Sequence, residues 1–192
     1  MQFFKKTITS LCILLLFVSS CTYSKKIDLY HVHKENTEVE RTIAQSKEYL
    51  RAGNFNRAID VHRTSFARYP NDQKLLKSYI KTLEDIRNVA DRTFDKKDFA
   101  RAGKTYYVLR KNYAHFKNFD ELLSFDAEFL NERLTECRTY LSRKGMEEYR
   151  KRHFNEAIVI WKNLLVFDPD NAYIKNAIDT ATVQARTLEG KK

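Results

Sequence analysis

The stretch FNEAIVIWKNLLVFDPDN, residues 154–171, has the same layout as FNRAIDVHRTSFARYPND, residues 55–72. Both begin with Phe-Asn, continue with Ala-Ile in the fourth and fifth places, and carry a proline fifteen residues after the phenylalanine. A third copy, FARAGKTYYVLRKNYA, starts at Phe99 and has Ala114 where the other two have proline. Repetition in register is typical of arrays of stacked units. The chain is therefore expected to be a repeat protein.

The composition favours helices. Only four Gly and two Pro occur among 192 residues, which is too little turn chemistry for an all-β protein. A hydrophobic content of 43% excludes wholesale disorder. An all-α fold is therefore predicted.

Small residues mark the helix crossings. Ala58, Ala102 and Ala157 occupy the same place in the three copies. Paired helices whose axes lie about 8–10 Å apart leave no room for a large side chain at the closest approach. These alanines are therefore predicted to be buried between paired helices.

Proline marks the end of the second helix of a pair. Pro70 and Pro169 have no amide hydrogen and disfavour helical geometry in the residue before them. Asn71 and Asn171 follow and are expected to cap the next helix.

Together these features resemble the tetratricopeptide repeat (TPR). In the last copy Gly145 stands where that family has a small residue in its first helix, Ala157 where the second helix comes close, and Trp161 at a bulky position one turn later. The resemblance implies a solenoid of antiparallel helical hairpins with a groove lined by the first helix of each pair. The alanine spacings of 44 and 55 residues exceed the family's repeat of about 34, which predicts lengthened first helices at 72–96 and 119–152.

About seven helices are expected, two of them unusually long. The capping box of the longest would be Asn118 with Glu121. The last helix would close the array with one apolar face, made of Ile174, Ala177, Ile178, Ala181 and Leu188. The expected ranges are 38–52, 55–68, 72–96, 99–113, 119–152, 155–167 and 171–187.

The first twenty residues are typical of a signal peptide, because Lys5 and Lys6 precede a short apolar run at 11–18. The sequence VSSC that follows, ending at Cys21, resembles the lipobox of bacterial lipoproteins. That resemblance implies cleavage before Cys21, lipid on this cysteine and a tether at 21–37; Thr22 then points to the outer membrane, facing the periplasm. The alternative is ordinary cleavage near Ser20, which would release a secreted protein. The helical array would occupy 38–192.

Few residues have the spacing of a catalytic or metal site. Cys137 is the one cysteine left after cleavage and acylation, and is expected to be a small core residue. His31 and His33 offer two imidazoles without a third ligand, which favours a solvated tether over a metal site. The AGKT sequence at 102–105 lacks the first glycine of a phosphate-binding loop and lies in an expected helix. His62, His115 and His153 are expected at packing edges. We therefore predict that the chain is not an enzyme and that it binds no metal, cofactor or small-molecule substrate.

Charge is uneven along the chain. Residues 71–117 carry 12 basic and 6 acidic side chains. Export argues against nucleic acid as the partner, so this segment is interpreted either as a binder of anionic envelope polymers or lipids, or as a solvated basic face.

The remaining candidate site is the concave groove, which receives a peptide or a helix in such arrays. The chain is therefore predicted to be an envelope adaptor that binds protein partners, although a wet helical surface is the alternative for any single residue. Of the five-residue carboxylate clamp of some family members, only Asn88 and Arg143 match. The groove residues expected from the family register are Lys47, Leu50, Arg51, Arg87, Asn88, Asp91, Arg143, Met146, Tyr149 and Arg150.

Overall fold

The computed structural model describes residues 36–189. The predicted signal peptide, the predicted lipidation site Cys21, His31, His33 and all but the end of the predicted tether lie outside the described residues. No helix in the described part of the chain is long and apolar enough to cross a membrane.

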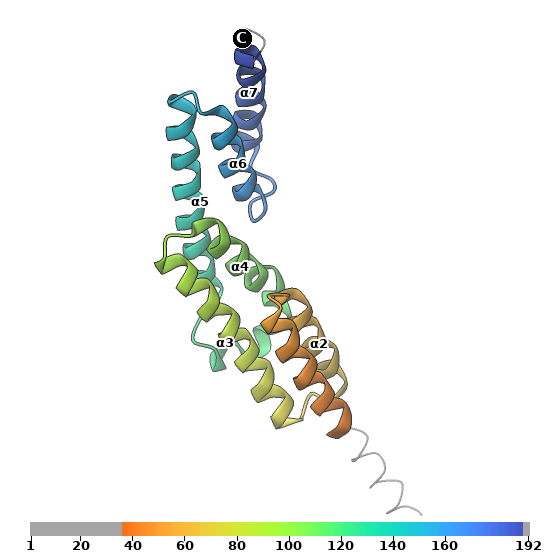
Figure 1. Cartoon of the computed structure of the whole chain (residues 1–192). Coiled ribbons are helices and arrows are strands. Elements are labelled where there is room, and N and C mark those ends of the chain that lie inside the picture. Colours follow the sequence, from red (N-terminus) through yellow and green to blue (C-terminus); the bar gives the residue numbers. More distant parts are fainter. Residues whose placement is uncertain (1–35, 190–192) are drawn as a thin grey trace, which may run out of the picture.

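The described residues form helices packed as sequential pairs, and they contain no strand (Figure 1). The predicted all-α fold is confirmed. A first helix covers 36–51 and is followed by α2 (Phe55–Arg68), α3 (Gln73–Asp95), α4 (Phe99–Asn112), the 3-10 turns η1 (Tyr113–His115) and η2 (Lys117–Leu122), α5 (Ala127–Arg150), α6 (Phe154–Leu165) and α7 (Ala172–Glu189).

Three hairpins repeat one register: the first helix with α2, α3 with α4, and α5 with α6 (Figure 1). At each crossing a small residue of the first helix lies twelve positions before the alanine of the second, and both are buried. Small side chains at these sites let the helices approach closely. The pairs are Ser46 and Ala58, Ala90 and Ala102, and Gly145 and Ala157.

The three hairpin turns are also alike. Gly53, Lys97 and Arg152 each lie five positions before the buried alanine and have φ of 70°, 62° and 64°. A left-handed residue ends a helix by turning the chain out of its path, and the second helix begins two residues later. The sequence therefore repeats because one helix–turn–helix unit is built three times.

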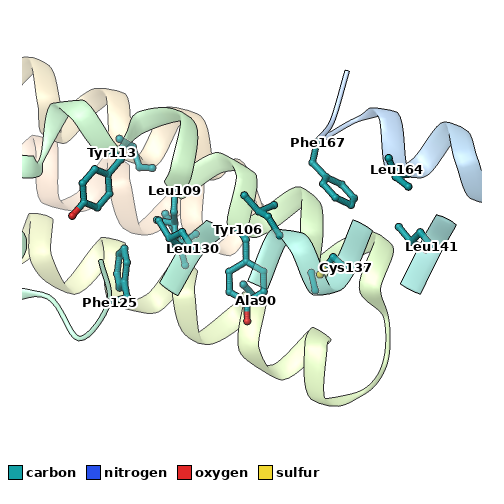
Figure 2. Close-up of a cluster of buried hydrophobic side chains, with 14 of the residues drawn as sticks. Ala90, Tyr106, Leu109, Tyr113, Phe125, Leu130, Cys137, Leu141, Leu164 and Phe167 are labelled. Carbon is teal, nitrogen blue, oxygen red and sulfur yellow. The ribbon is translucent and has the colours of Figure 1, made fainter. Parts of the chain in front are cut away.

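The hairpins stack around a continuous apolar core. Figure 2 shows side chains of α3, α4 and α5, such as Ala90, Leu109 and Leu130, in one cluster that continues to Leu164 of α6 and to Phe167 just after this helix. The long helix α5 runs past both α4 and α6, so it joins the earlier hairpins to the last one.

The prediction of a helix over 119–152 is wrong in its first part. Residues 117–122 form the 3-10 turn η2, with Phe119 outside helical geometry, and Leu122 is exposed. Phe119 instead packs edge-on against Tyr79 of α3, with ring centroids 5.3 Å apart. Phe119 is thus buried because its segment packs against α3, although its spacing in the sequence is that of a helix. The packing of the two rings outweighs the local periodicity.

Two helix-cap predictions are also wrong. Asp126, not Asn118 with Glu121, caps α5 and accepts a hydrogen bond from the amide of Phe129 at 2.8 Å. Asp72, not Asn71, caps α3 by accepting from the amide of Leu75.

The third predicted cap is confirmed, since Asn171 Oδ1 accepts from the amide of Ile174 at 3.0 Å. On the closing helix α7, Ile174 and Ala181 are buried, and Ala177 and Ile178 are half-buried. Leu188 is exposed, so the predicted apolar face does not reach the end of the helix.

Candidate functional site

Two adjoining hollows lie between α5 and α7 and share the side chains of Met146 and Tyr173. Together they are called the α5–α7 groove. The first hollow, of about 600 Å³, is lined by Arg138, Thr139, Ser142, Arg143, Met146, Glu147, Arg150, Asn171 and Tyr173. The second, of about 260 Å³, is lined by Met146, Tyr149, Trp161, Tyr173, Asn176, Ala177 and Thr180.

The base of the groove depends on Gly145. A Cβ atom at this position would lie 2.2 Å from Nε1 of Trp161, so no other residue fits without moving the ring. Trp161 is 1% exposed, and its Nε1 donates to the carbonyl of Ser142 at 3.4 Å. Tyr149 packs beside it, with ring centroids 6.0 Å apart. The glycine therefore allows α6 to place a large aromatic ring at the base of the groove.

One polar link positions α7 against α5. Arg138 Nε donates to Asp168 Oδ2 at 2.7 Å, and the side-chain amide of Asn171 donates to the same oxygen at 2.8 Å. Asn171 is also the cap of α7, so the start of this helix is held at a defined place beside α5.

Several basic side chains near the groove already have a carboxylate partner. Lys144, Lys151 and His153 surround the carboxylate of Glu148, and the pKa of Glu148 is lowered to about 2 by its hydrogen bonds with His153, Lys151 and Lys144. Arg138 is paired with Asp168. These side chains therefore already have a carboxylate partner within the protein.

Two arginines on the α5 wall remain open. Arg143 is 69% exposed at its side chain and lies 3.9 Å from Glu147, at the limit of an ion pair. Arg150 is exposed and forms no ion pair with any residue that the structure describes. An exposed pair like that of Arg143 with Glu147 contributes little to stability. The guanidinium groups of Arg143 and Arg150 can therefore each donate hydrogen bonds to an external carboxylate.

The structure brings four of the ten predicted groove residues together. Arg143, Met146 and Arg150 line the larger hollow, and Met146 and Tyr149 line the smaller one. The residues on the first helix, namely Lys47, Leu50 and Arg51, do not line this groove: Lys47 and Arg51 are exposed, and Leu50 packs against the core.

The predicted groove residues on α3 do not line it either, and they bond to one another. Arg87 donates to Asp91 at 2.6 Å and to Asn88 at 2.9 Å, and also pairs with Glu84. The other oxygen of Asp91 accepts from the hydroxyl of Tyr106 on α4 at 2.5 Å. Asp91 thus ties α3 to α4.

The α7 wall was not predicted from the sequence. Tyr173, Asn176, Ala177 and Thr180 lie three, four and seven residues apart and carry no charge. The apolar face predicted for α7, which includes Ala177, indicated only the side of the helix that packs on α6. The uncharged residues Tyr173, Asn176 and Thr180 beside that face are the sequence signal for the groove.

Other candidates are core residues. Cys137 is buried, and desolvation raises the pKa of its thiol to about 12, as expected of a small core residue and not a nucleophile. Gly103 of the AGKT stretch lies inside α4, where an added Cβ would meet the ring of Phe167 at 2.6 Å. No group of three or more metal-ligating side chains occurs among residues 36–189.

The prediction for one histidine is wrong. His62 is fully buried, not at a packing edge: Nε2 lies 3.0 Å from Thr82 Oγ1, and its ring stacks on Tyr79. His115 and His153 are exposed, as an edge position requires.

Comparison of the chain with protein-family models, with curated proteins and with solved structures gave no match. What the structure establishes is an all-helical protein of antiparallel packed helices.

Proposed function

We propose that the chain is a TPR-type adaptor of the bacterial cell envelope, anchored by lipid on Cys21, that binds a protein partner in its α5–α7 groove. The observation that most supports this proposal is the groove, which combines an aromatic base, an uncharged α7 wall and two exposed arginines. Aromatic and arginine side chains at a partly desolvated site are the composition of interface hot spots.

The repeat geometry supports the array part of this proposal. Three hairpins share the small residue, the buried alanine and the left-handed turn residue at fixed spacing. The VSSC sequence supports a lipid anchor on Cys21, and Thr22 after it supports the outer membrane. An adaptor of this plan would hold components of an envelope assembly or secretion complex without catalysis.

The alternative partner is an anionic polymer or lipid bound by the basic segment 71–117. Part of its charge is paired, since Lys74 pairs with Glu40, Lys81 with Asp85 and Arg87 with Asp91. Anionic-polymer binding should vanish above about 0.5 M salt, whereas groove docking should persist because part of it is apolar.

Crosslinking and pull-down from solubilised envelopes test the adaptor. The wild type and a groove variant, Tyr149→Ala with Arg150→Glu, are compared at equal expression. We expect specific proteins to be recovered with the wild type and lost with the variant. Identical partners from both would show that the groove does not bind them.

A separate variant tests the anchor. Cys21→Ser removes the acylated sulfur, so the protein should move from the membrane fraction to the soluble fraction. Unchanged membrane association would contradict the lipid anchor. The role of the groove would still be decided by the pull-down, which does not depend on the anchor.

A further inference from the structure

We infer that the occupant of the α5–α7 groove is a helix of a partner protein that carries two carboxylates seven residues apart, with a large apolar side chain between them. This inference rests on the proposed function and specifies the chemistry of the partner.

The groove has the form of a helix-binding site. The helix α6 packs against both α5 and α7, and Trp161 of α6 lies at the base where these two outer helices face each other. Three helices thus form three sides of a bundle whose fourth side is open. A partner helix would complete it by packing on both walls.

The α7 wall offers contact without charge. Tyr173, Asn176 and Thr180 line the groove, whereas the charged residues Lys175 and Asp179 are not among its lining residues. Tyr173 is 62% exposed, although its ring is one of the largest apolar surfaces on the helix. A helix laid along this wall would cover that ring and desolvate no charged group on α7.

The α5 wall specifies the charges. Arg143 and Arg150 are seven residues apart, which is two helical turns and about 10.5 Å along the axis. Met146 lies between them and faces both hollows. A partner helix that runs along α5 repeats the same spacing, so carboxylates at i and i+7 can each meet one arginine while an apolar residue at i+3 or i+4 meets Met146.

Charge complementarity distinguishes this occupant from a polyanion. The larger hollow contains three arginines and one glutamate, and the smaller hollow contains no charged side chain. A sulfated or phosphorylated polymer would use only Arg143 and Arg150, because Arg138 is paired with Asp168. An amphipathic acidic helix would use these two arginines together with the exposed or half-buried side chains of Met146, Tyr149 and Tyr173.

The test is a fluorescence-anisotropy titration of the full-length protein in detergent with labelled helical peptides. The probe peptide has glutamates seven residues apart and phenylalanine between them. A control peptide has the same composition but places its glutamates five residues apart, on different faces. Dextran sulfate serves as a polyanion competitor.

We expect the probe peptide to bind about tenfold more tightly than the control peptide. The double variant Arg143→Glu, Arg150→Glu should abolish this preference, and a probe with lysine in place of glutamate should bind that variant instead. The variant Lys77→Glu, Lys111→Glu reverses the same number of exposed charges outside the groove and should bind like the wild type.

Equal binding of the two peptides, full displacement by dextran sulfate even above about 0.5 M salt, or an unchanged affinity in the Arg143→Glu, Arg150→Glu variant would each overturn the inference. If the peptides fail while envelope pull-down still depends on Tyr149, the groove binds a protein of different chemistry. If the pull-down also shows no dependence on the groove, the adaptor function fails as well.

Discussion

The first and last hairpins have the same backbone register but different cores. Where the last hairpin has Gly145 facing Trp161, the first has Ser46 and His62 at the equivalent positions. Nε1 of Trp161 lies against the open Cα of the glycine, whereas Ser46 and His62 both lie within hydrogen-bond distance of the hydroxyl of Thr82, at 3.1 Å and 3.0 Å.

This difference shows that the repeat specifies how closely the two helices pack, whereas the ring-bearing residue at the position of His62 and Trp161 can differ between hairpins. A glycine accommodates an indole, and a serine accommodates a smaller polar ring. The polar seam makes the first hairpin sensitive to protonation. The aromatic packing gives the last hairpin a base for its groove.

The largest expected effect is the loss of the indole. Trp161→Ala removes a ring that is 1% exposed and leaves a cavity, so the free energy of unfolding should fall by about 3–5 kcal/mol. Urea denaturation measures this change. Tyr173→Ala, also in the groove but 62% exposed, is the control and should change stability by less than about 0.5 kcal/mol. A similar small loss for both would show that Trp161 is not a core residue.

Acidification should weaken the first hairpin. Burial lowers the pKa of His62 from 6.5 to about 4, so the unfolded chain binds more protons than the folded chain between these values. The stability due to neutral His62 is complete above pH 6.5 and is lost as pH falls towards 4, with a loss of about 2 kcal/mol by pH 5. Denaturation curves at pH 7 and pH 5 measure the loss.

The last hairpin should respond at lower pH. Glu148 has its pKa lowered to about 2, so its stabilising contribution is present above about pH 4.5 and is lost only below that.

A variant of the first hairpin separates the two pH ranges. Because Glu148 does not respond between pH 7 and pH 5, His62→Gln should remove most of the stability change in that range. An unaltered pH dependence in that variant would contradict the assignment to His62.

Overpacking the last crossing should have an intermediate effect. Gly145→Ala places a Cβ 2.2 Å from Trp161 Nε1 and should lower the free energy of unfolding by about 1–3 kcal/mol. Ala157→Leu acts at the same crossing and should fall in the same range. Because Trp161 is the one tryptophan in the chain, its emission spectrum reports whether the ring moves. Unchanged emission and melting temperature in both variants would contradict the crossing.

The smallest effect should come from the turns. Lys97 and Arg152 adopt positive φ, which glycine tolerates without cost and which Gly53 supplies in the first hairpin. Arg152→Gly should therefore raise the free energy of unfolding by up to about 1 kcal/mol. Gly53→Ala should lower it by a similar amount, and the opposite sign for either variant would contradict the shared turn geometry.

The sequence predicted the array because its signals are local and repeated. Alanine at fixed register and the turn between helices depend on neighbours within one hairpin, so they can be read along the chain. The fold of 113–126 could not be read in this way, since Phe119 lies at helical spacing but packs against Tyr79, forty residues earlier.

The groove was only half predictable for the same reason. Arg143 and Arg150 share one helix, so their common face follows from periodicity. Tyr173 joins them only because α6 turns α7 back towards α5, and the bonds among Arg87, Asn88 and Asp91 depend on contacts that periodicity does not specify.

Site-specific photocrosslinking in intact envelopes tests the groove most directly. A photoreactive amino acid replaces either Tyr173 in the groove or Val159 on α6, which are exposed to similar extents, 62% and 59%. We expect a defined protein adduct from position 173, none from position 159, and loss of the adduct when Arg143 and Arg150 are changed to glutamate. The same adduct from position 159, or no adduct from position 173, would contradict it.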